Sequence, residues 1–416
     1  MARSNLICGI DIGNTFVKTI IAEIDREQLR PRVVGLASVP SNGLRRGVVV
    51  DMEETMANIR DYVEQASAMG GVKINRAYVS INGAHIRSQM SRGVIAVARA
   101  DNEISQNDID RVIDAAAAIS LPPNREIIHI IPKRFVIDNQ ENVKNPLGMK
   151  GVRLEADVLL IEGLSPYIRN LARCINGCDI EVAEFVFTPL AAAKSSLDKH
   201  QIEHGVMSID FGGGISTLAF FHEGEMIHSA TLPIGSRHIT NDLAIALRTT
   251  MDSAEEIKCL YGYTGPNETL SKDQVDLSEF TGGEGTIVPK KQLAKIIDAR
   301  ISELFDLITA EVRKVPSDIM LPAGVVLIGG GAALNGLPNL TKSRMRLSVN
   351  VGISRHQPCL IDGIRDRLND PSLSTALGLV IWGFEKEFST HGEPLLVSSS
   401  RSGLSKVGRW LKNFLP

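Results

Sequence analysis

Two acidic residues, each followed two positions later by a glycine, carry the strongest chemical signal in the sequence. Asp11 precedes Gly13 and Asp210 precedes Gly212, and each acid stands where an apolar, strand-like run ends. A carboxylate at a strand end suits Mg²⁺, which keeps several of its waters and takes few direct protein ligands. We therefore expect Asp11 and Asp210 to lie beside one Mg²⁺ ion and to hold it through water.

The residues that follow each acid are suited to phosphate. Glycine lets backbone N–H groups approach phosphate oxygens with no Cβ in the way, and hydroxyl and ammonium groups add further donors. Two such turns facing one another would hold the β- and γ-phosphates of a nucleotide. A single Asp-x-Gly is better explained by a hairpin turn, but two matched copies favour the phosphate site. The predicted phosphate-binding residues are Gly13, Asn14, Thr15 and Lys18 in the first copy and Gly212, Gly213, Gly214 and Thr217 in the second.

A third glycine cluster, Gly329, Gly330 and Gly331, follows a buried-type strand at 324–328. This arrangement brings bare backbone close to a planar or anionic ligand. It is not a Walker A loop, because no Gly-Lys-Ser/Thr follows, and Leu334 breaks the spacing of a dinucleotide-binding fingerprint.

Between the second and third clusters, the pattern predicts a helix that Ser253 caps and Glu256 completes as a capping box. Glu255 and Lys258 lie on one face of this helix. By themselves, these two residues are better explained as a surface ion pair.

Strands and helices must position these residues, and the sequence predicts both. The stretches 6–23 and 206–221 each read as strand, tight turn and strand, so the chain contains an internal repeat. Residues 52–69 form a helix, and Pro289 opens a second, longer one. The apolar face of the first helix holds Ile59, Tyr62, Val63 and Ala66, and that of the second holds Leu293, Ile296, Ile297, Ile301, Leu304, Phe305 and Ile308.

The region 83–163 reads as a separate unit, with strands at 94–98, 135–138 and 158–161 and a helix at 106–119. A helix at 167–177 and a strand at 182–187 then return to the first unit. The sequence therefore predicts two α/β halves, the first of which carries an insertion.

Length and composition agree with this organisation. The 416 residues suffice for two to three domains, and the net charge of -3 gives no basic field to hold nucleic acid. Five scattered cysteines indicate a reducing compartment rather than a disulfide framework. The apolar run at 6–10 is too short for a signal peptide, and no stretch is long enough to span a membrane.

These motifs occur in the order seen in the actin, heat-shock-70 and sugar-kinase superfamily, and further segments resemble one member, the FtsA family of bacterial cell-division proteins. The resemblance covers nearly the whole chain. Its most specific block runs from His129-x-x-Pro132 to Asn145-Pro146-x-Gly148-Met149. The other segments are Gly47–Asp51, Ala77–Gly83, Arg153–Glu155, Thr188–Ala193 and Pro371–Leu379.

The resemblance implies an α/β, actin-like two-domain ATPase fold in which subdomain 1C is inserted in place of actin subdomain 1B. It also implies that ATP binds with Mg²⁺, and that adenosine contacts Glu255, Lys258, Gly329, Gly330, Gly331 and Leu334. The expected subdomains are 1A (1–82, 164–203 and 361–388), 1C (83–163), 2A (204–245 and 314–360) and 2B (246–313), followed by a flexible linker (389–402).

The last residues, 403–416, have the pattern of an amphipathic helix that lies on a membrane. Apolar residues recur at helical spacing, and three cations lie off that face, where they would attract anionic lipid. A terminal helix packed in the core is the alternative. The predicted membrane-contacting residues are Leu404, Lys406, Val407, Arg409, Trp410, Leu411, Lys412, Phe414 and Leu415.

The resemblance further implies a peripheral protein on the cytoplasmic face of the inner membrane at the division septum. Such a protein polymerises with itself, tethers the C-terminal tail of FtsZ and recruits later division proteins. Arg300 is expected to contact that acidic tail, although a solvated helix charge explains it equally well. Thr188 occupies the position of the water-orienting Glu or Gln of the superfamily, so we expect ATP hydrolysis to be slow or absent. A small-molecule kinase or chaperone and a pilus-assembly relative are the alternatives.

Overall fold

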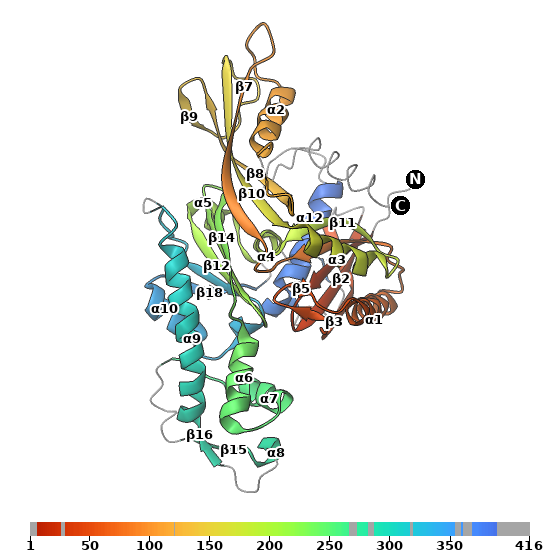
Figure 1. The fold of residues 1–416 in the computed structure, drawn as a ribbon, viewed down its shortest axis with the longest axis vertical. Coiled ribbons are helices and arrows are strands. Elements are labelled where there is room, and N and C mark those ends of the chain that lie inside the picture. The colour runs from red at the N-terminus through yellow and green to blue at the C-terminus, as the bar shows by residue number, and fades with distance from the viewer. Residues whose placement is uncertain are drawn as a thin grey trace.

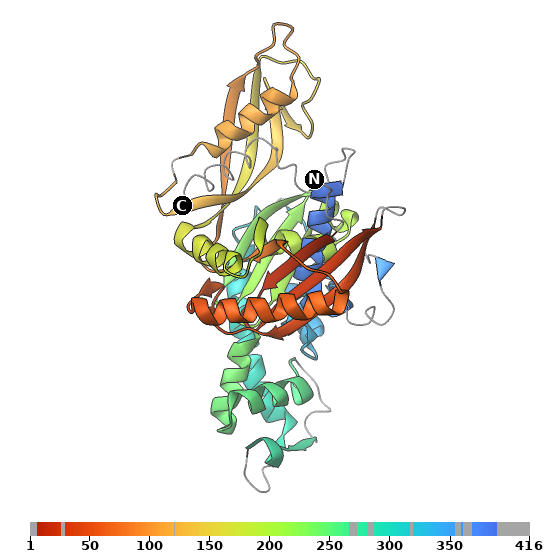
Figure 2. The same ribbon diagram turned by 90° about the vertical axis from the view of Figure 1, so that its right-hand side faces the viewer.

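A computed structural model of the chain describes residues 6–25, 30–119, 121–265, 273–281, 287–316, 319–353, 359–360 and 368–388. These residues form two central sheets, one small sheet at one end of the long axis and a helical lobe at the other (Figures 1 and 2). Linker 389–402 and helix 403–416 of the sequence prediction lie outside the described residues.

The first central sheet has the order β11-β6-β1-β2-β3-β19. β1 and β2 form an antiparallel hairpin, and β6 lies parallel to β1 on its other side. α1 (Met52–Gly70) covers this sheet with the predicted apolar face, and Asp51 caps it through a hydrogen bond from the Glu54 amide. The strands are β1 (Leu6–Ile12), β2 (Phe16–Asp25), β3 (Arg30–Pro40), β6 (Arg76–Ile81), β11 (Glu181–Phe187) and β19 (Cys359–Leu360), with the small hairpin β4 (Leu44–Arg45) and β5 (Val48–Val49) beside them.

The second central sheet repeats this topology in the order β14-β13-β12-β17-β18. β12 pairs antiparallel with β13 and parallel with β17, as β1 does with β2 and β6. The internal repeat predicted from the sequence is thus confirmed as two equivalent hairpins. The strands are β12 (Val206–Phe211), β13 (Ser216–His222), β14 (Glu225–Leu232), β17 (Val325–Ile328) and β18 (Val349–Val351).

Two helices, α4 (Thr188–Ser196) and α12 (Ser374–Phe388), pack against each other between the two halves (Figure 1). They approach so closely that a Cβ on Gly378 would lie 1.8 Å from the Ala191 carbonyl oxygen. The Ser195 hydroxyl donates to the Ser374 carbonyl oxygen at 2.7 Å. A glycine at the crossing therefore sets the spacing of the two helices.

The inserted unit is a four-stranded sheet in the order β7-β10-β8-β9, with α2 on one face (Figures 1 and 2). It has its own apolar core, which includes Val112, Leu154 and Val158. The three expected strands are confirmed, and each begins earlier in the chain than predicted, at Arg87, Arg125 and Arg153. The elements are β7 (Arg87–Ala96), α2 (Gln106–Ala117), β8 (Arg125–Ile137), β9 (Gln140–Val143) and β10 (Arg153–Leu164).

The helical lobe contains α6 (Ser236–Leu247), α7 (Met251–Tyr261) and α9 (Lys290–Val312). The predicted cap of α7 is wrong: Thr250 is the N-cap, and its hydroxyl accepts a hydrogen bond from the Ser253 amide. Both residues are good caps, and the helix begins one turn earlier than the capping-box pattern suggests. The remaining elements are α3 (Ser165–Asn176), α5 (Lys199–His204), β15 (Gln274–Asp276), α8 (Ser278–Thr281), β16 (Ile287–Pro289), α10 (Leu337–Met345) and the 3₁₀ turns η2 (Gly330–Ala333) and η3 (Pro371–Leu373).

In the part of the chain that the structure describes, no helix combines the length and apolar character needed to cross a bilayer.

Candidate nucleotide site

The two hairpin turns have the same backbone geometry. The Gly13 amide donates to the Phe16 carbonyl oxygen at 3.1 Å, and the Gly212 amide donates to the Ile215 carbonyl oxygen at 3.1 Å. The register is also equivalent, because Asp11 lies opposite Lys18 and Asp210 lies opposite Thr217. The two predicted phosphate loops are therefore structural counterparts.

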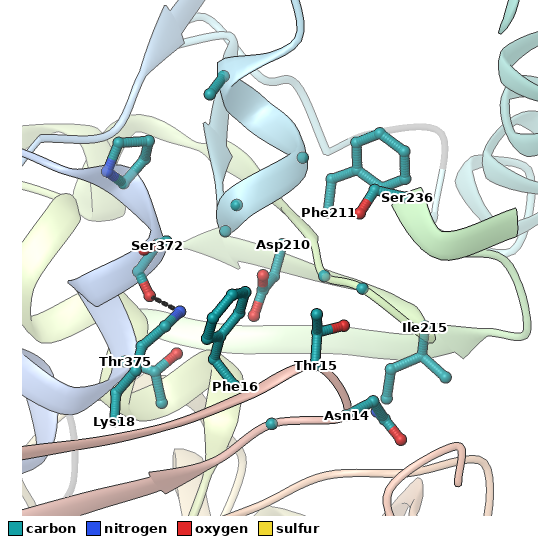
Figure 3. A pocket seen from close by; sticks show the side chains of 18 of the residues that line it. Asn14, Thr15, Phe16, Lys18, Asp210, Phe211, Ile215, Ser236, Ser372 and Thr375 are labelled. Atoms are coloured by element: carbon teal, nitrogen blue, oxygen red, sulfur yellow. Dashed lines mark hydrogen bonds between the residues drawn. The ribbon is translucent and has the colours of Figure 1, made fainter. Parts of the chain in front are cut away.

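The two loops face each other across a cavity of about 480 Å³ (Figure 3). They come so close that a Cβ on Gly213 would lie 1.8 Å from the Thr15 hydroxyl oxygen, and one on Gly214 would lie 2.9 Å from Asn14 Cγ. The Asn14 side chain is fixed from behind, because its Oδ1 accepts a hydrogen bond from the Gly47 amide at 2.8 Å. Only glycine fits in the second loop at this separation.

Both predicted carboxylates line this cavity. Burial raises the pKa of Asp11, although the Lys18 ammonium and a hydrogen bond from the Ser80 hydroxyl oppose the shift. Burial and the nearby Asp11 charge raise the pKa of Asp210 to about 7, against the opposing effect of Lys18. Because burial disfavours the charge on both carboxylates, and the Asp11 charge also disfavours that on Asp210, the pair attracts a proton or a divalent cation.

The Lys18 ammonium and the Thr15 hydroxyl, which belong to the first predicted phosphate loop, also line the cavity. The Lys18 ammonium donates to the Ser372 carbonyl oxygen of η3 (Figure 3). The Thr15 hydroxyl oxygen is buried and has no hydrogen-bond partner among the described residues. A buried polar atom without a partner is costly, so this hydroxyl fits a polar ligand such as a phosphate oxygen.

The far wall of the cavity joins α7 to the glycine cluster. Glu255 accepts hydrogen bonds from the Lys258 ammonium at 2.7 Å and from the Thr240 hydroxyl. Burial opposes ionisation of this carboxyl, but these hydrogen bonds outweigh it and lower the pKa of Glu255. The surface-ion-pair alternative is wrong for Lys258, whose side chain is 9% exposed. The pair thus belongs to the cavity wall.

The glycine cluster closes the same wall. Gly329 has φ +82°, and a Cβ there would lie 2.3 Å from Asp210 Oδ1. Gly331 packs on the Phe211 ring, while Gly330 and Leu334 line the cavity beside them. All of the predicted phosphate, metal and adenosine residues except Gly214 are thereby brought to one cavity, and Gly214 lies in the loop that borders it.

Sequence reasoning missed several residues that line the cavity or contact its carboxylates. Ser80 hydrogen-bonds Asp11, and Asn82 donates through Nδ2 to the Thr217 hydroxyl at 2.8 Å. Phe16 and Ser372 also line it. Asn82 lies in one of the family-like segments, but no local spacing distinguishes it. Thr188, the first residue of α4, also lines the cavity, and its hydroxyl donates to the Ile81 carbonyl oxygen at 3.3 Å.

Arg300 lies away from this cavity, on α9 in the helical lobe. Its guanidinium donates through Nε and Nη2 to Asp242 of α6 at 2.8 and 2.9 Å, and through Nη1 to Glu303 at 2.5 Å. The side chain remains 26% exposed. Arg300 is therefore an ion-paired residue at the surface of the lobe.

Comparison with known proteins identifies the family. A family model described as "SHS2 domain inserted in FTSA" matches residues 83–162, and one described as "Cell division protein FtsA" matches residues 207–378. A cell division protein FtsA of Pseudomonas aeruginosa is 35% identical, over 98% of this chain and 97% of its own length. The chain belongs to the FtsA family of cell-division proteins. FtsA proteins of Borreliella burgdorferi and Bacillus subtilis are each 34% identical, over 92% and 91% of this chain and 92% and 84% of their own lengths.

Solved structures of low sequence identity to this chain show the fold. The chain in a PilM-PilN type IV pilus biogenesis complex has a TM-score of 0.67 at 14% identity, covering 91% of this chain and 98% of that one. MreB5 of Spiroplasma citri, solved bound to ADP, has a TM-score of 0.56 at 12% identity, covering 93% and 99%. The predicted fold class is confirmed: the chain has an actin-like ATPase fold with an inserted SHS2 domain, at the position predicted for subdomain 1C.

The raised pKa of Asp210 predicts how replacement of this residue by asparagine changes stability with pH. Between about pH 4 and 7 the folded state holds a proton that the unfolded chain releases, so wild-type stability falls as the pH rises through this window. Asp210→Asn removes that dependence. The free energy of unfolding of Asp210→Asn, minus that of the wild type, should therefore rise from pH 5 to pH 8 by an amount on the order of a few kcal/mol.

Urea unfolding without Mg²⁺ at several pH values measures this difference, and Glu53→Gln, on the exposed side of α1, controls for the lost negative charge. A constant difference between Asp210→Asn and wild type from pH 5 to pH 8 would contradict the raised pKa.

Proposed function

We propose that the chain is an ATP-binding adaptor of bacterial cell division. It polymerises on the cytoplasmic face of the cell membrane at the division septum, anchors FtsZ filaments there and recruits later septal-ring proteins. The observation that carries the nucleotide part of this proposal is the pair of equivalent hairpin loops facing one cavity, each with a carboxylate at its strand end. Membership of the FtsA family supports the cell-division part.

The residues of the cavity fit an Mg²⁺-ATP complex. Asp11 and Asp210 would hold the metal through its waters, and the metal charge would relieve the repulsion between them. The two loops, with Thr15, Lys18 and Thr217, would bind the phosphates. Adenosine would lie between α7 and η2, against the residues predicted for it: Glu255, Lys258, Gly329, Gly330, Gly331 and Leu334.

The arrangement of residues around the cavity does not favour ATP hydrolysis. Activation of a water needs a group that can orient or deprotonate it, and Thr188 offers only a hydroxyl that is already donated to a carbonyl oxygen. We propose that the nucleotide controls polymerisation and that its turnover is slow or absent.

The membrane part of the proposal rests on residues 403–416 of the sequence. Their apolar residues fall on one helical face, with Lys406, Arg409 and Lys412 beside it. At about 1.5 Å per residue such a helix is too short to span hydrocarbon, but it suits the headgroup plane. Trp410 is a residue type that prefers this interface.

The FtsZ part of the proposal places its acidic tail on the helical lobe, at Arg300. This arginine already pairs with Asp242 and Glu303. An acidic peptide would therefore exchange with Glu303, the more exposed of the two partners, while Asp242 continues to orient the guanidinium.

Two other functions are less well supported. A small-molecule kinase or a chaperone explains neither the inserted SHS2 domain nor the amphipathic sequence at 403–416. A role in pilus assembly is suggested by the fold that this chain shares with the protein of the PilM-PilN complex. The FtsA relatives, however, are much more similar to this chain in sequence.

Removal of residues 403–416 should abolish binding to anionic lipid. The full chain should co-sediment with vesicles that contain phosphatidylglycerol, and the truncated chain should stay in the supernatant. Because each cation contributes about 1 kcal/mol near such a surface, reversing the charge of Lys406, Arg409 and Lys412 should weaken binding by about 100-fold or more. A scrambled tail of the same composition is the matched control for the apolar spacing, and it too should bind weakly. Equal sedimentation of the full and truncated chains would rule out this anchor.

Arg300→Ala should weaken binding of an FtsZ C-terminal peptide by at least about tenfold, because it removes a charged hydrogen-bond donor. Glu303→Gln should strengthen binding, since it removes a competing carboxylate and leaves the Arg300–Asp242 pair intact. Fluorescence anisotropy with a labelled peptide measures both, with Lys314→Ala beyond the far end of α9 as the control. If Arg300→Ala binds as wild type does, the docking site lies elsewhere.

A further inference from the structure

The end of strand β6 and the two residues that follow it, residues 80–83, contact both halves of the molecule. β6 lies next to β1, which ends in the first phosphate loop, and next to β11, which leads into α4. The match to the inserted SHS2 domain begins at Gly83, the last of these residues. The segment is therefore placed to relate the cavity to the inserted domain.

The first two residues contact the first half of the molecule. The Ser80 hydroxyl donates to Asp11 Oδ1 at 2.8 Å and accepts a hydrogen bond from the Ile12 amide at 2.9 Å. The Ile81 carbonyl oxygen accepts the hydroxyl of Thr188, at the start of α4. Both contacts fix the strand end to the carboxylate side of the cavity.

Asn82 crosses the cavity to the second half. Its Nδ2 donates to the Thr217 hydroxyl of β13 at 2.8 Å, and its Oδ1 accepts the Thr231 hydroxyl of β14 at 3.3 Å. Thr217 and Thr231 lie opposite each other in the β13–β14 register, so one carboxamide contacts both strands. We call Asn82, Thr217 and Thr231 the clasp.

The clasp also fixes the start of the inserted domain. Asn82 Oδ1 accepts the Gly83 amide at 2.8 Å, and Gly83 has φ +145°, a conformation that favours glycine. Two residues before Thr231, the Ser229 carbonyl oxygen of β14 accepts the Ser88 hydroxyl of β7 at 3.3 Å. The same strand therefore contacts both the clasp and the inserted domain.

We infer that Asn82 is a positioning residue that couples closure of the two halves around a nucleotide to the orientation of the inserted SHS2 domain. This inference rests on the proposed nucleotide binding. When the second phosphate loop moves with β13 toward a bound triphosphate, Thr217 and Thr231 move with it, and Asn82 transmits that movement to Gly83 and β7. Without the clasp, the nucleotide would still bind, but the inserted domain would no longer follow.

Thr231→Val tests this inference best, because it removes one of the two hydrogen bonds of the clasp at a residue that does not line the cavity and leaves the bond from Asn82 to Thr217 in place. Spin labels at Leu147→Cys in the inserted domain and Ile245→Cys on α6, both exposed sites, report the distance between the two regions in a background without accessible native cysteines. Thr309→Val is the matched control, since its hydroxyl bonds only its own helix. Calorimetry measures ATP binding for each variant.

In the spin-labelled protein with an unsubstituted clasp, Mg²⁺-ATP should shift or narrow the distribution of distances between the two labels. Thr231→Val should bind ATP with an affinity within about threefold of wild type but lose at least half of the ATP-induced change in distance. Thr309→Val should keep the whole change. Asn82→Ala should also lose the ATP-induced change in distance. The double variant Asn82→Ala/Thr231→Val should lose no more of it than Asn82→Ala does.

A full response in Thr231→Val would overturn the inference, and so would ATP binding to the unsubstituted protein without any change in distance. Failure of calorimetry to detect ATP binding would overturn the proposed nucleotide function and this inference with it. These results are distinguishable, because binding and distance are measured separately.

Discussion

The burial of two carboxylates against one cavity is the constraint on which the rest of the structure depends. Asp11 and Asp210 lie near the ends of equivalent strands in the two halves. Burial raises the pKa of both carboxyl groups, and the Asp11 charge further raises that of Asp210. Neither has an arginine partner among the described residues, and Lys18 only partly offsets their charge. A divalent cation between the two halves would offset the cost of burying two carboxylates so close together.

The fold follows from bringing those two strand ends together. Two hairpins with the same register give two loops of the same shape, and glycines at 213 and 214 let the loops approach without steric overlap. α4 and α12 set the distance between the halves, because Gly378 lets them cross in direct contact. Cavity, sheets and crossing helices thus form one arrangement in which movement of either half changes the nucleotide site.

Local patterns predicted much of this arrangement, and long-range contacts account for what they missed. Both hairpins, α1 and the apolar stripe of α9 follow from alternation, helical spacing and turn glycines within a few residues. The start of α7 was misplaced because Thr250 and Ser253 are both good caps. The roles of Asn82 and Ser372, and the pairing of Arg300 with Asp242, depend on residues from 58 to 354 positions away, which no local spacing reveals.

Calorimetry of ATP binding to the full chain, with and without Mg²⁺, tests the central claim most directly. The account predicts that Mg²⁺ strengthens ATP binding by at least about tenfold, and that this enhancement disappears when Asp11 and Asp210 are both replaced by asparagine. An ATP affinity that is the same with and without Mg²⁺, or no measurable ATP binding at all, would contradict it.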